Sequence, residues 1–336
     1  SLLQPETPLT VEAAISPEVD VESRLESLGR ERQDALRVEN TVQDQQLRDE
    51  LQQFGYDIFS RAPSTFAPVE GIPVPADYRI GPGDNIVVQL FGKRNVEYNL
   101  VVTRDGKILI PEFGPVAVGG LTFDDAETLI MSGFEQRVIG ARAVVTMGKL
   151  RTIQIRVAGD VRQPGIFTIG GLSSLIDALL TTGGVAGTGS LRDIRLIRDG
   201  RIVSRLDLYD LLLRGGSDAD TFLRHHDTIF VPAIGDIVYV GGDVQRPAIY
   251  ELRGETTLGE VLAMAGGALP TASLADSLIE RIVAGGGRSI IDFHRGGEAL
   301  VDEQILATPV QSGDFLRILP LEDELDGAVM LEGHVE

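Results

Sequence analysis

The sequence lacks cysteine and tryptophan, and these absences exclude several classes of function. Without Cys the chain has no disulfide framework, no thiolate metal site and no thiol nucleophile. Aromatic residues make up only 5% of the 336 residues, as six Tyr and twelve Phe. Stacking platforms for nucleic acid need clustered aromatic faces, and a sugar-binding cleft of that kind would need them too. The composition therefore does not favour a dense aromatic binding cleft.

The chain also has little positive charge and no long apolar run. Its 30 Lys and Arg residues against 50 Asp and Glu residues give a net charge of -20. This charge repels phosphate backbones, so we expect no nucleic-acid partner. No run reaches the roughly 18 to 20 apolar residues of a membrane-spanning helix, and no basic-then-apolar leader opens the sequence. The length predicts two or three domains.

The N-terminal part of the sequence changes composition twice. Residues 1–60 carry 13 acidic and 5 basic residues, with no proline between Pro17 and Pro63, and this favours an acidic helical arm. Its apolar positions form a broken stripe, which does not predict a long coiled coil. A solvated and partly mobile arm and an arm docked on a neighbour both remain open. Residues 61–76 contain four prolines and predict an extended linker.

Residues 77–150 combine strand patterns with one helix pattern. The β-rich runs 86–91, 100–102 and 143–147 predict strands. Asp105-Gly106 predicts a hairpin turn between 101–103 and 108–110, because glycine accepts a positive φ. Thr122 and Asp125 predict a capping box for a helix that reaches about Arg137. These elements predict a small α/β domain.

The strongest pattern is an internal repeat with an offset of 83 residues. The segment Val157-Ala158-Gly159-Asp160-Val161 recurs as Val240-Gly241-Gly242-Asp243-Val244, and Pro164 recurs as Pro247. The offset also relates two predicted helix starts, where the N-cap and N3 residues are Ser174 with Asp177 and Thr257 with Glu260. The pairs Gly183-Gly184 and Gly266-Gly267 predict left-handed residues where these helices end.

Each unit predicts a β-grasp fold: strand, turn, strand, capped helix, Gly-Gly turn and further strands. We assign 151–234 to repeat 1 and 235–320 to repeat 2. The segment Leu331–Val335 matches the earlier Val-x-Gly-x-Val starts, so 321–336 is predicted to be a linker and the start of a third repeat. The predicted fold class is α+β: a small α/β domain followed by tandem β-grasp repeats, with an acidic helical N-terminal arm.

These motifs resemble those of the bacterial polysaccharide export protein family, which exports capsule and exopolysaccharide. Residues 77–84, Asp-Tyr-Arg-Ile-Gly-Pro-Gly-Asp, resemble its opening motif. Residues 103–108 with Pro111 and Gly114 resemble its hairpin, and Gly120-Leu121-Thr122 resembles its helix start. The units that begin at Ile153 and Asp236 resemble the soluble-ligand-binding β-grasp repeats that follow the export domain in this family.

The resemblance implies a function and partners for the chain. It implies the periplasmic part of an outer-membrane protein that forms a structural conduit for polysaccharide, with 77–150 as the export domain. The full-length protein would form a homo-oligomeric ring and work with an inner-membrane polysaccharide copolymerase. A carbohydrate-binding cell-envelope module and, less favoured, a polysaccharide-modifying enzyme remain as alternatives.

The sequence predicts no catalytic, cofactor or metal residues, and substrate-binding residues stay unassigned. Residues 81–84, Gly-Pro-Gly-Asp, lack the Lys and Ser or Thr of a phosphate-binding loop and predict a structural turn. The pair His225-His226 would point to opposite faces of a strand, which does not favour a metal site. We therefore expect a non-enzymatic protein without a cofactor.

Several pairs of carboxylates remain as candidates for glycoside hydrolysis, which needs two acids facing one cleft. The helix dipole accounts for acidic residues in a first helical turn, and Gly-Asp sequences build turns. The pairs weighed in this way are Asp124-Asp125, Asp207 with Asp210, Asp218 with Asp220, and the repeated Asp160 and Asp243. None of these pairs predicts catalysis over a structural role.

Overall fold

A computed structural model of the chain describes residues 47–60, 73–91, 95–111, 113–137, 142–216, 218–283, 285, 287–295, 298–299 and 301–321. The chain divides into two compact units, Ser1–Leu51 and Gln52–Glu336. In the first unit only residues 47–51 are described, and 47–50 are helical. Most of the predicted arm 1–60, the linker 61–76 and the third-repeat start in 321–336 lie outside the described residues.

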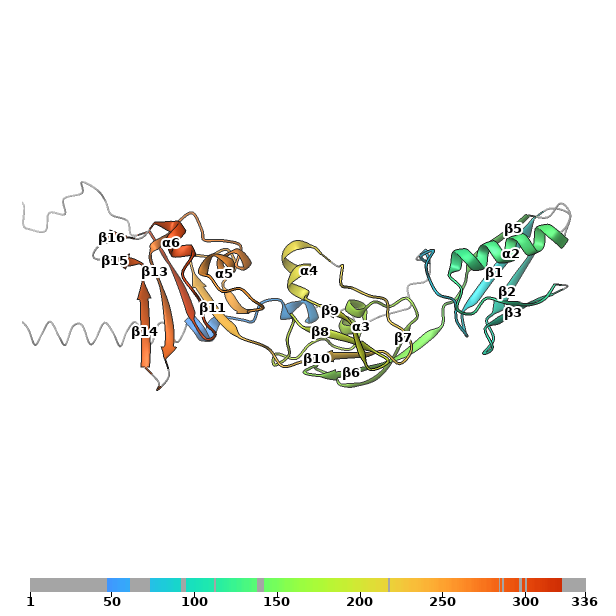
Figure 1. Ribbon diagram of the computed structural model, residues 1–336, viewed down its shortest axis with the longest axis horizontal. Coiled ribbons are helices and arrows are strands. Elements are labelled where there is room, and N and C mark those ends of the chain that lie inside the picture. Colours follow the sequence, from blue (N-terminus) through green and yellow to red (C-terminus); the bar gives the residue numbers. More distant parts are fainter. Residues whose placement is uncertain are drawn as a thin grey trace, which may run out of the picture. The chain divides into compact units, whose positions relative to one another are not determined.

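The export-type region forms a small domain that contains a two-stranded sheet of β3 and β4 and one helix on a larger sheet (Figure 1). The larger sheet has the order β2-β1-β5, and both outer strands run antiparallel to β1. Alternate residues of β1, including Ile86 and Val88, are buried against Ile130 and Phe134 of the helix. The bounds are β1 Asn85–Phe91, β2 Val96–Val101, β3 Lys107–Ile110, β4 Gly114–Ala117, α2 Phe123–Arg137 and β5 Arg142–Met147.

The helix α2 begins with the predicted capping contacts. The Asp125 backbone N–H donates to the Thr122 hydroxyl at 3.2 Å, and this hydroxyl donates to the Asp125 carboxylate at 2.7 Å. These contacts satisfy an N–H group that has no partner within the helix. The predicted start of this helix is confirmed.

The predicted hairpin at Asp105-Gly106 has the right turn and the wrong strand pairing. Gly106 has a φ of 76°, and its N–H donates to the Thr103 carbonyl at 2.9 Å. The Thr103 N–H donates to the Lys107 carbonyl at 2.8 Å across the turn, but no ladder continues from this bond: β2 pairs with β1 and β3 pairs with β4. Val102 explains the difference: its N–H donates to the Asp84 carbonyl at 2.8 Å, which holds the end of β2 beside β1.

The two repeats form five-stranded sheets with the same strand order. Repeat 1 has the order β7-β6-β10-β8-β9, and repeat 2 has the order β12-β11-β17-β13-β14. In each sheet the first and last strands of the repeat lie parallel at the centre, as β6 with β10 and β11 with β17. This shared topology confirms the prediction of two tandem β-grasp units.

The elements of the two repeats match at the 83-residue offset as far as their first helices, α3 and α5, and drift after them. Repeat 1 contains β6 Thr152–Gly159, β7 Gly165–Gly170, α3 Leu175–Thr181, β8 Ile194–Arg198, β9 Arg201–Leu206, α4 Leu208–Arg214 and β10 Thr228–Val231. Repeat 2 contains β11 Ile237–Gly242, β12 Ala248–Glu251, α5 Leu258–Met264, β13 Ala272–Val283, β14 Gly287–Asp292, β15 His294–Arg295, β16 Glu298–Ala299, α6 Asp302–Leu306 and β17 Phe315–Pro320.

Both repeat helices carry the predicted start signal. Ser174 and Thr257 are the N-caps of α3 and α5, and each closes a capping box with Asp177 and Glu260 respectively. Backbone N–H donation from Thr256 and Thr257 lowers the pKa of Glu260. The prediction of two equivalent capped helices is confirmed.

Both helices also end at the predicted glycine pairs. The four glycines of these pairs have φ between 82° and 92°. Gly184 and Gly267 donate their N–H groups to Leu179 and Leu262, 83 residues apart in the two repeats, at 2.8 Å in each case. Because an L side chain rarely adopts this backbone conformation, glycine ends both helices by the same local chemistry.

A second glycine position fixes the first strand of each repeat. Gly159 and Gly242 have φ of 89° and 86°. A Cβ atom there would lie 1.9 Å from the Val231 carbonyl oxygen or 2.0 Å from the Ile318 carbonyl oxygen. Both repeats therefore need a glycine at this position for a steric reason: the last strand of each repeat, β10 or β17, lies too close for a side chain.

Residues 52–60 lie against both repeats, although the export domain separates them from the repeats in the sequence. A 3-10 helix, η1, spans Tyr56–Phe59. Gln53 forms a parallel bridge with Ile249, and Phe59 is buried in the core of the repeats. Residues 52–60 are therefore docked on the repeats of their own chain.

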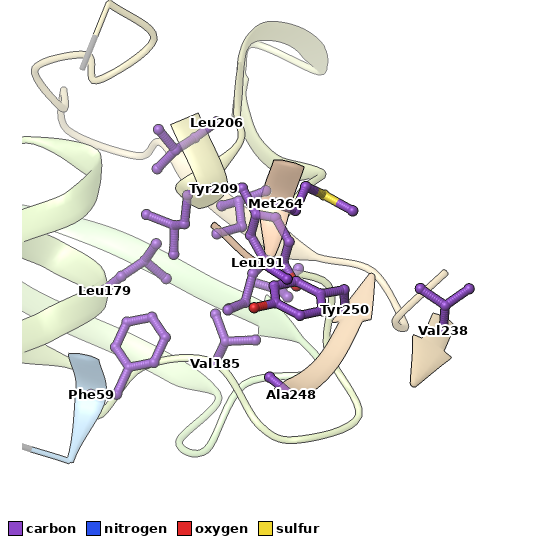
Figure 2. Packing of buried hydrophobic residues seen from close by; sticks show 14 of the residues in the cluster. Phe59, Leu179, Val185, Leu191, Leu206, Tyr209, Val238, Ala248, Tyr250 and Met264 are labelled. Atoms are coloured by element: carbon purple, nitrogen blue, oxygen red, sulfur yellow. The ribbon is translucent and has the colours of Figure 1, made fainter. Parts of the chain in front are cut away.

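One hydrophobic core runs through both repeats. Its buried members include Phe59, Val185 and Leu191 together with Tyr250 and Met264. Figure 2 shows these residues around the place where the two repeats meet. The burial of side chains from both repeats in a single cluster favours their behaviour as one cooperative unit.

Candidate functional site at the junction of the repeats

A buried Asp in each of the three domains pairs with an Arg, and the first of these pairs joins the export domain to Arg151, the first residue of repeat 1. The three acidic residues are Asp84, Asp227 and Asp314. Each follows a residue with positive φ and directly precedes a strand. Each carboxylate accepts the backbone N–H of the residue three positions earlier, at 2.7 to 2.8 Å. Their Arg partners are given by the salt bridges Arg151–Asp84 at 2.5 Å, Arg198–Asp227 at 2.6 Å and Arg281–Asp314 at 2.7 Å.

These pairs explain the Asp before the first strand of the export domain and before the last strand of each repeat. The three Asp side chains are fully buried, and a buried carboxylate requires a cation and hydrogen-bond donors. Hydrogen bonding to Asp227 and Asp314 raises the pKa of Arg198 and Arg281, although burial opposes this rise. Because Arg198 and Arg281 are 83 residues apart, the sequence offset could have identified them.

The junction between the repeats is organised around Arg192. Its Nη1 donates to the Glu251 carbonyl and to the Glu255 carboxylate, both at 2.9 Å. Its Nε donates to the Asp207 carboxylate at 3.2 Å, and its guanidinium lies 4.6 Å from the centre of the Tyr209 ring. One buried cation of repeat 1 therefore holds a helix-capping carboxylate of its own repeat and two groups of repeat 2.

Glu251 of repeat 2 forms hydrogen bonds with residues of repeat 1. Its carboxylate accepts the Leu191 N–H at 3.1 Å and the Gly235 N–H at 3.0 Å. Its backbone N–H donates to the Tyr209 hydroxyl at 3.0 Å. Buried charges that are hydrogen-bonded on several sides fix orientation as well as contact, so the junction specifies one arrangement of these residues.

The pKa values at the junction follow from burial and from Arg192. Burial alone would raise the pKa of Glu255, but the hydrogen bond from Arg192 and the Arg253 backbone N–H hold it below its ordinary value. Burial raises the pKa of Tyr209 far above its ordinary value, and it does the same for Tyr56. At neutral pH Glu255 is thus ionised beside Arg192, and Tyr56 and Tyr209 stay neutral.

Residues 52–59 complete the junction. The Phe54 ring stacks on Tyr250 with centroids 5.1 Å apart and meets Tyr209 edge-on at 5.0 Å. The Gln53 amide donates to the Gly187 carbonyl at 3.0 Å, and the Tyr56 hydroxyl donates to the Gly189 carbonyl. This segment therefore bonds to repeat 2 through Ile249 and to repeat 1 through its loop 187–189.

Phe59 anchors the far end of the same segment. It is 5% exposed, and a Cβ on Gly184 would lie only 2.2 Å from its ring. The glycine that ends α3 therefore also makes room for this ring. The sequence indicated Gly184 as a helix end, but it carried no signal for the ring that lies over it.

Most of the carboxylates weighed as acids have structural partners. Asp207 caps α4 through the Tyr209 N–H, Asp210 pairs with Arg214, and Asp220 accepts the Ile176 N–H. Asp160 and Asp243 accept the hydroxyls of Thr188 and Thr271, again 83 residues apart. Asp124 and Asp125 lie in the first turn of α2, and Asp218 is exposed.

The expected geometry of His225 and His226 is wrong. The two rings do not point to opposite faces of a strand; their centroids are 4.0 Å apart. The reason is that the pair lies in the turn before β10, where His226 has a φ of 71°. The His225 Nδ1 accepts the Gln154 N–H at 3.0 Å. In the part of the chain that is described, no three metal-ligating side chains form a group.

Comparison with known proteins assigns families to all three domains. Residues 72–148 match the polysaccharide biosynthesis/export protein family, and 153–231 and 237–292 each match an SLBB domain. These matches agree with the resemblance of the chain to the bacterial polysaccharide export protein family. The residues that match the export family include the turn at Asp84. The residues that match the SLBB domains include both capping boxes and Arg192.

Curated relatives of this family cover about half of the chain. A polysialic acid transport protein, KpsD of Escherichia coli, is 33% identical over 181 residues, which is 53% of this chain and 32% of the relative. The EPS I polysaccharide export outer membrane protein EpsA of Ralstonia solanacearum is 32% identical over 200 residues, which is 58% of this chain and 52% of the relative. The chain thus spans about a third to a half of these relatives' lengths.

None of the helices in the described part of the chain is both long enough and apolar enough to cross a membrane.

Proposed function

We propose that this chain is the periplasmic part of an outer-membrane polysaccharide export protein and acts as a structural conduit. Its full-length form would assemble into a homo-oligomeric ring and work with an inner-membrane polysaccharide copolymerase. The names of the relatives support this proposal, since one is a polysialic acid transport protein and another an EPS I polysaccharide export outer membrane protein. We propose capsule or exopolysaccharide as the transported polymer.

The observation that carries the proposal is the fixed junction of the repeats. Arg192, Glu251 and Phe54 join two domains through buried charges and stacked rings. A conduit must hold its walls in a constant arrangement while polymer passes, and such a junction resists bending. In the division we propose, 77–150 is the export domain and 151–234 and 235–320 are the two repeats.

The placement of the aromatic residues favours a conduit over a carbohydrate-binding module. Binding clefts present aromatic faces together with a few polar groups. Here Phe54, Tyr209 and Tyr250 stack on one another inside the junction, where packing already occupies their faces. This arrangement supports a structural role for these aromatic residues.

We further propose that the chain is not an enzyme. Glycoside hydrolysis needs an acid and a base or nucleophile facing one cleft. The buried carboxylates of Asp84, Asp227 and Asp314 are each neutralised by an Arg and hydrogen-bonded to backbone. Incubation of the purified chain with cognate polymer should leave its length unchanged by gel filtration. Depolymerisation that one carboxylate substitution abolishes would overturn this part of the proposal.

Export in cells tests the conduit directly. The exposed residues Glu97 and Arg142 lie on β2 and β5, in the sheet of the export domain. We expect the double reversal of Glu97→Lys with Arg142→Glu, which keeps the net charge, to reduce surface polysaccharide without lowering protein abundance or melting temperature. Matched reversals would then be made on each remaining exposed face of the domain. If export stays intact on every face, a peripheral binding role replaces the conduit.

A further inference from the structure

One edge of repeat 2 is closed by an added segment. The Ile249 N–H in β12 donates to the Gln52 carbonyl at 2.9 Å, and the Phe54 N–H donates to the Ile249 carbonyl at 2.9 Å. Gln53 between them forms a parallel bridge to Ile249. Both outward backbone groups of Ile249 are therefore used, and the β12 edge is not free at this residue.

Ile166 occupies the equivalent position on β7 of repeat 1, 83 residues earlier. Ile166 faces Arg156 as Ile249 faces Tyr239. The N–H groups of Arg156 and Tyr239 both point away from these partners, to the Asp227 and Asp314 carbonyls at 2.9 Å. In an antiparallel pair this pattern marks a non-hydrogen-bonded site. The Ile166 N–H and carbonyl therefore point off the edge of the sheet, as those of Ile249 do.

Nothing among the described residues pairs with this edge of repeat 1. The strand order of its sheet begins at β7, and the isolated bridges of the described chain do not involve residues 165–170. The Ile166 side chain is 69% exposed. Edge strands of monomeric proteins are usually protected by charge or proline. The β7 sequence, Gly-Ile-Phe-Thr-Ile-Gly, contains neither.

We propose that the β7 edge of repeat 1 pairs with the β9 edge of repeat 1 in a second copy of this chain. β9 is the opposite edge of the same sheet, and it exposes Ile202 at 45% and Val203 at 48%. The choice of partner rests on the proposed ring, because a ring needs two different faces of one subunit to meet head to tail. The two edges of one sheet supply such faces.

Strand directions agree with this contact. β7 runs antiparallel to β6, while β9 runs in the same direction as β6, because β6 and β10 are parallel and β10, β8 and β9 alternate. A sheet that continues from β9 of one copy to β7 of the next is therefore antiparallel at the join. The register shift at Leu196/Ile197 beside β9 limits the pairing to a few residues. The contact is consequently weak in dilute solution.

A photo-crosslinking amino acid at position 166 tests the contact. Over a rising concentration series, it should give dimers and larger species whose cross-linked peptide contains residues 201–206. The same probe at position 249 is the matched control, and it should cross-link within one copy to residues 52–54. A probe at 166 that reacts only within its own copy, with residues 61–72 for example, or not at all, would overturn the proposal.

Substitution at Ile166 separates association from folding. Ile166→Pro removes an N–H that takes no part in the ladder of its own sheet, so the fold should tolerate it. Association in analytical ultracentrifugation should be lost while the melting temperature stays close to that of the wild type. Ile166→Lys gives a second test if the proline variant does not fold. Association that persists in a folded variant would contradict the proposal.

The export assay distinguishes the two proposals. If Ile166→Lys abolishes intermolecular cross-links and export continues, the edge contact stands and the ring is not required for transport. If cross-links at position 166 are absent and the charge reversals in the export domain still block export, the conduit stands and the edge contact is wrong.

Discussion

Arg192 of repeat 1 donates to the Glu255 carboxylate of repeat 2 at 2.9 Å, and both side chains are largely shielded from solvent. This bond joins two domains that the sequence shows only as separate copies of one unit. Since Arg192 also bonds to Asp207 and to the Glu251 carbonyl, loss of one partner leaves a buried cation with fewer acceptors. The junction therefore offers direct tests of how the repeats are coupled.

Acid should weaken the junction through Glu255. Its pKa in the folded protein lies below the ordinary 4.5, so its stabilising effect is complete above pH 4.5 and is lost as the pH falls through the folded value. We expect Glu255→Gln to cost about 1 kcal/mol at pH 7, allowing for partial exposure, and nothing at low pH. Denaturant titration at several pH values measures this. The exposed Glu135→Gln is the control, and an equal cost at every pH would contradict the prediction.

Gly242→Ala should destabilise repeat 2 more than Gly313→Ala. The two glycines have nearly equal φ, 86° and 85°, so both substitutions cost roughly 1 to 2 kcal/mol for the left-handed backbone. Only Gly242 adds a clash, with the Ile318 carbonyl oxygen 2.0 Å from the new Cβ, whereas Gly313 has open space. Overpacking adds about 1 to 3 kcal/mol. Thermal unfolding of both variants compares them, and equal melting temperatures would show that the backbone relaxes.

Phe59→Ala should loosen the contact of residues 52–60 with repeat 1. The ring is 5% exposed and lies over Gly184, and truncation of a buried Phe costs about 3 to 5 kcal/mol. Faster hydrogen exchange should follow at Tyr56 and in the loop 187–189. The exposed Phe222→Ala, at 51% exposure, should change neither. Unaltered exchange in Phe59→Ala would mean that Phe54 alone holds the segment.

Arg281→Met should unfold repeat 2 at a lower denaturant concentration. It leaves the carboxylate of Asp314 buried without its cation, and breaking such a pair costs about 3 kcal/mol or more. Arg214→Met removes an exposed pair with Asp210, which contributes about 0.5 kcal/mol at most. Equal midpoints for the two variants in urea titration would show that Asp314 is adequately held by backbone N–H groups.

Much of the fold could be predicted because the deciding chemistry is local. Ser174 and Thr257 cap helices within three residues of themselves, and Gly184 and Gly267 end them within one turn. Their common 83-residue spacing predicted two β-grasp units before any contact was known. The hairpin at Gly106 marks the limit of this reasoning: the turn was local and correct, but the partner of β2 was decided by strand β1.

The contacts that join the domains were decided by tertiary structure alone. Arg192 and Glu255 are 63 residues apart in the sequence. Phe54 stacks on Tyr250, although the export domain and repeat 1 lie between them in the sequence. No local periodicity predicts such contacts, because each of these residues is an ordinary polar or apolar residue in its local sequence. The sequence by itself determined the domains, their order and their internal helix signals. Only the folded chain decided which edge of each sheet is covered, because that depends on where a distant segment comes to lie.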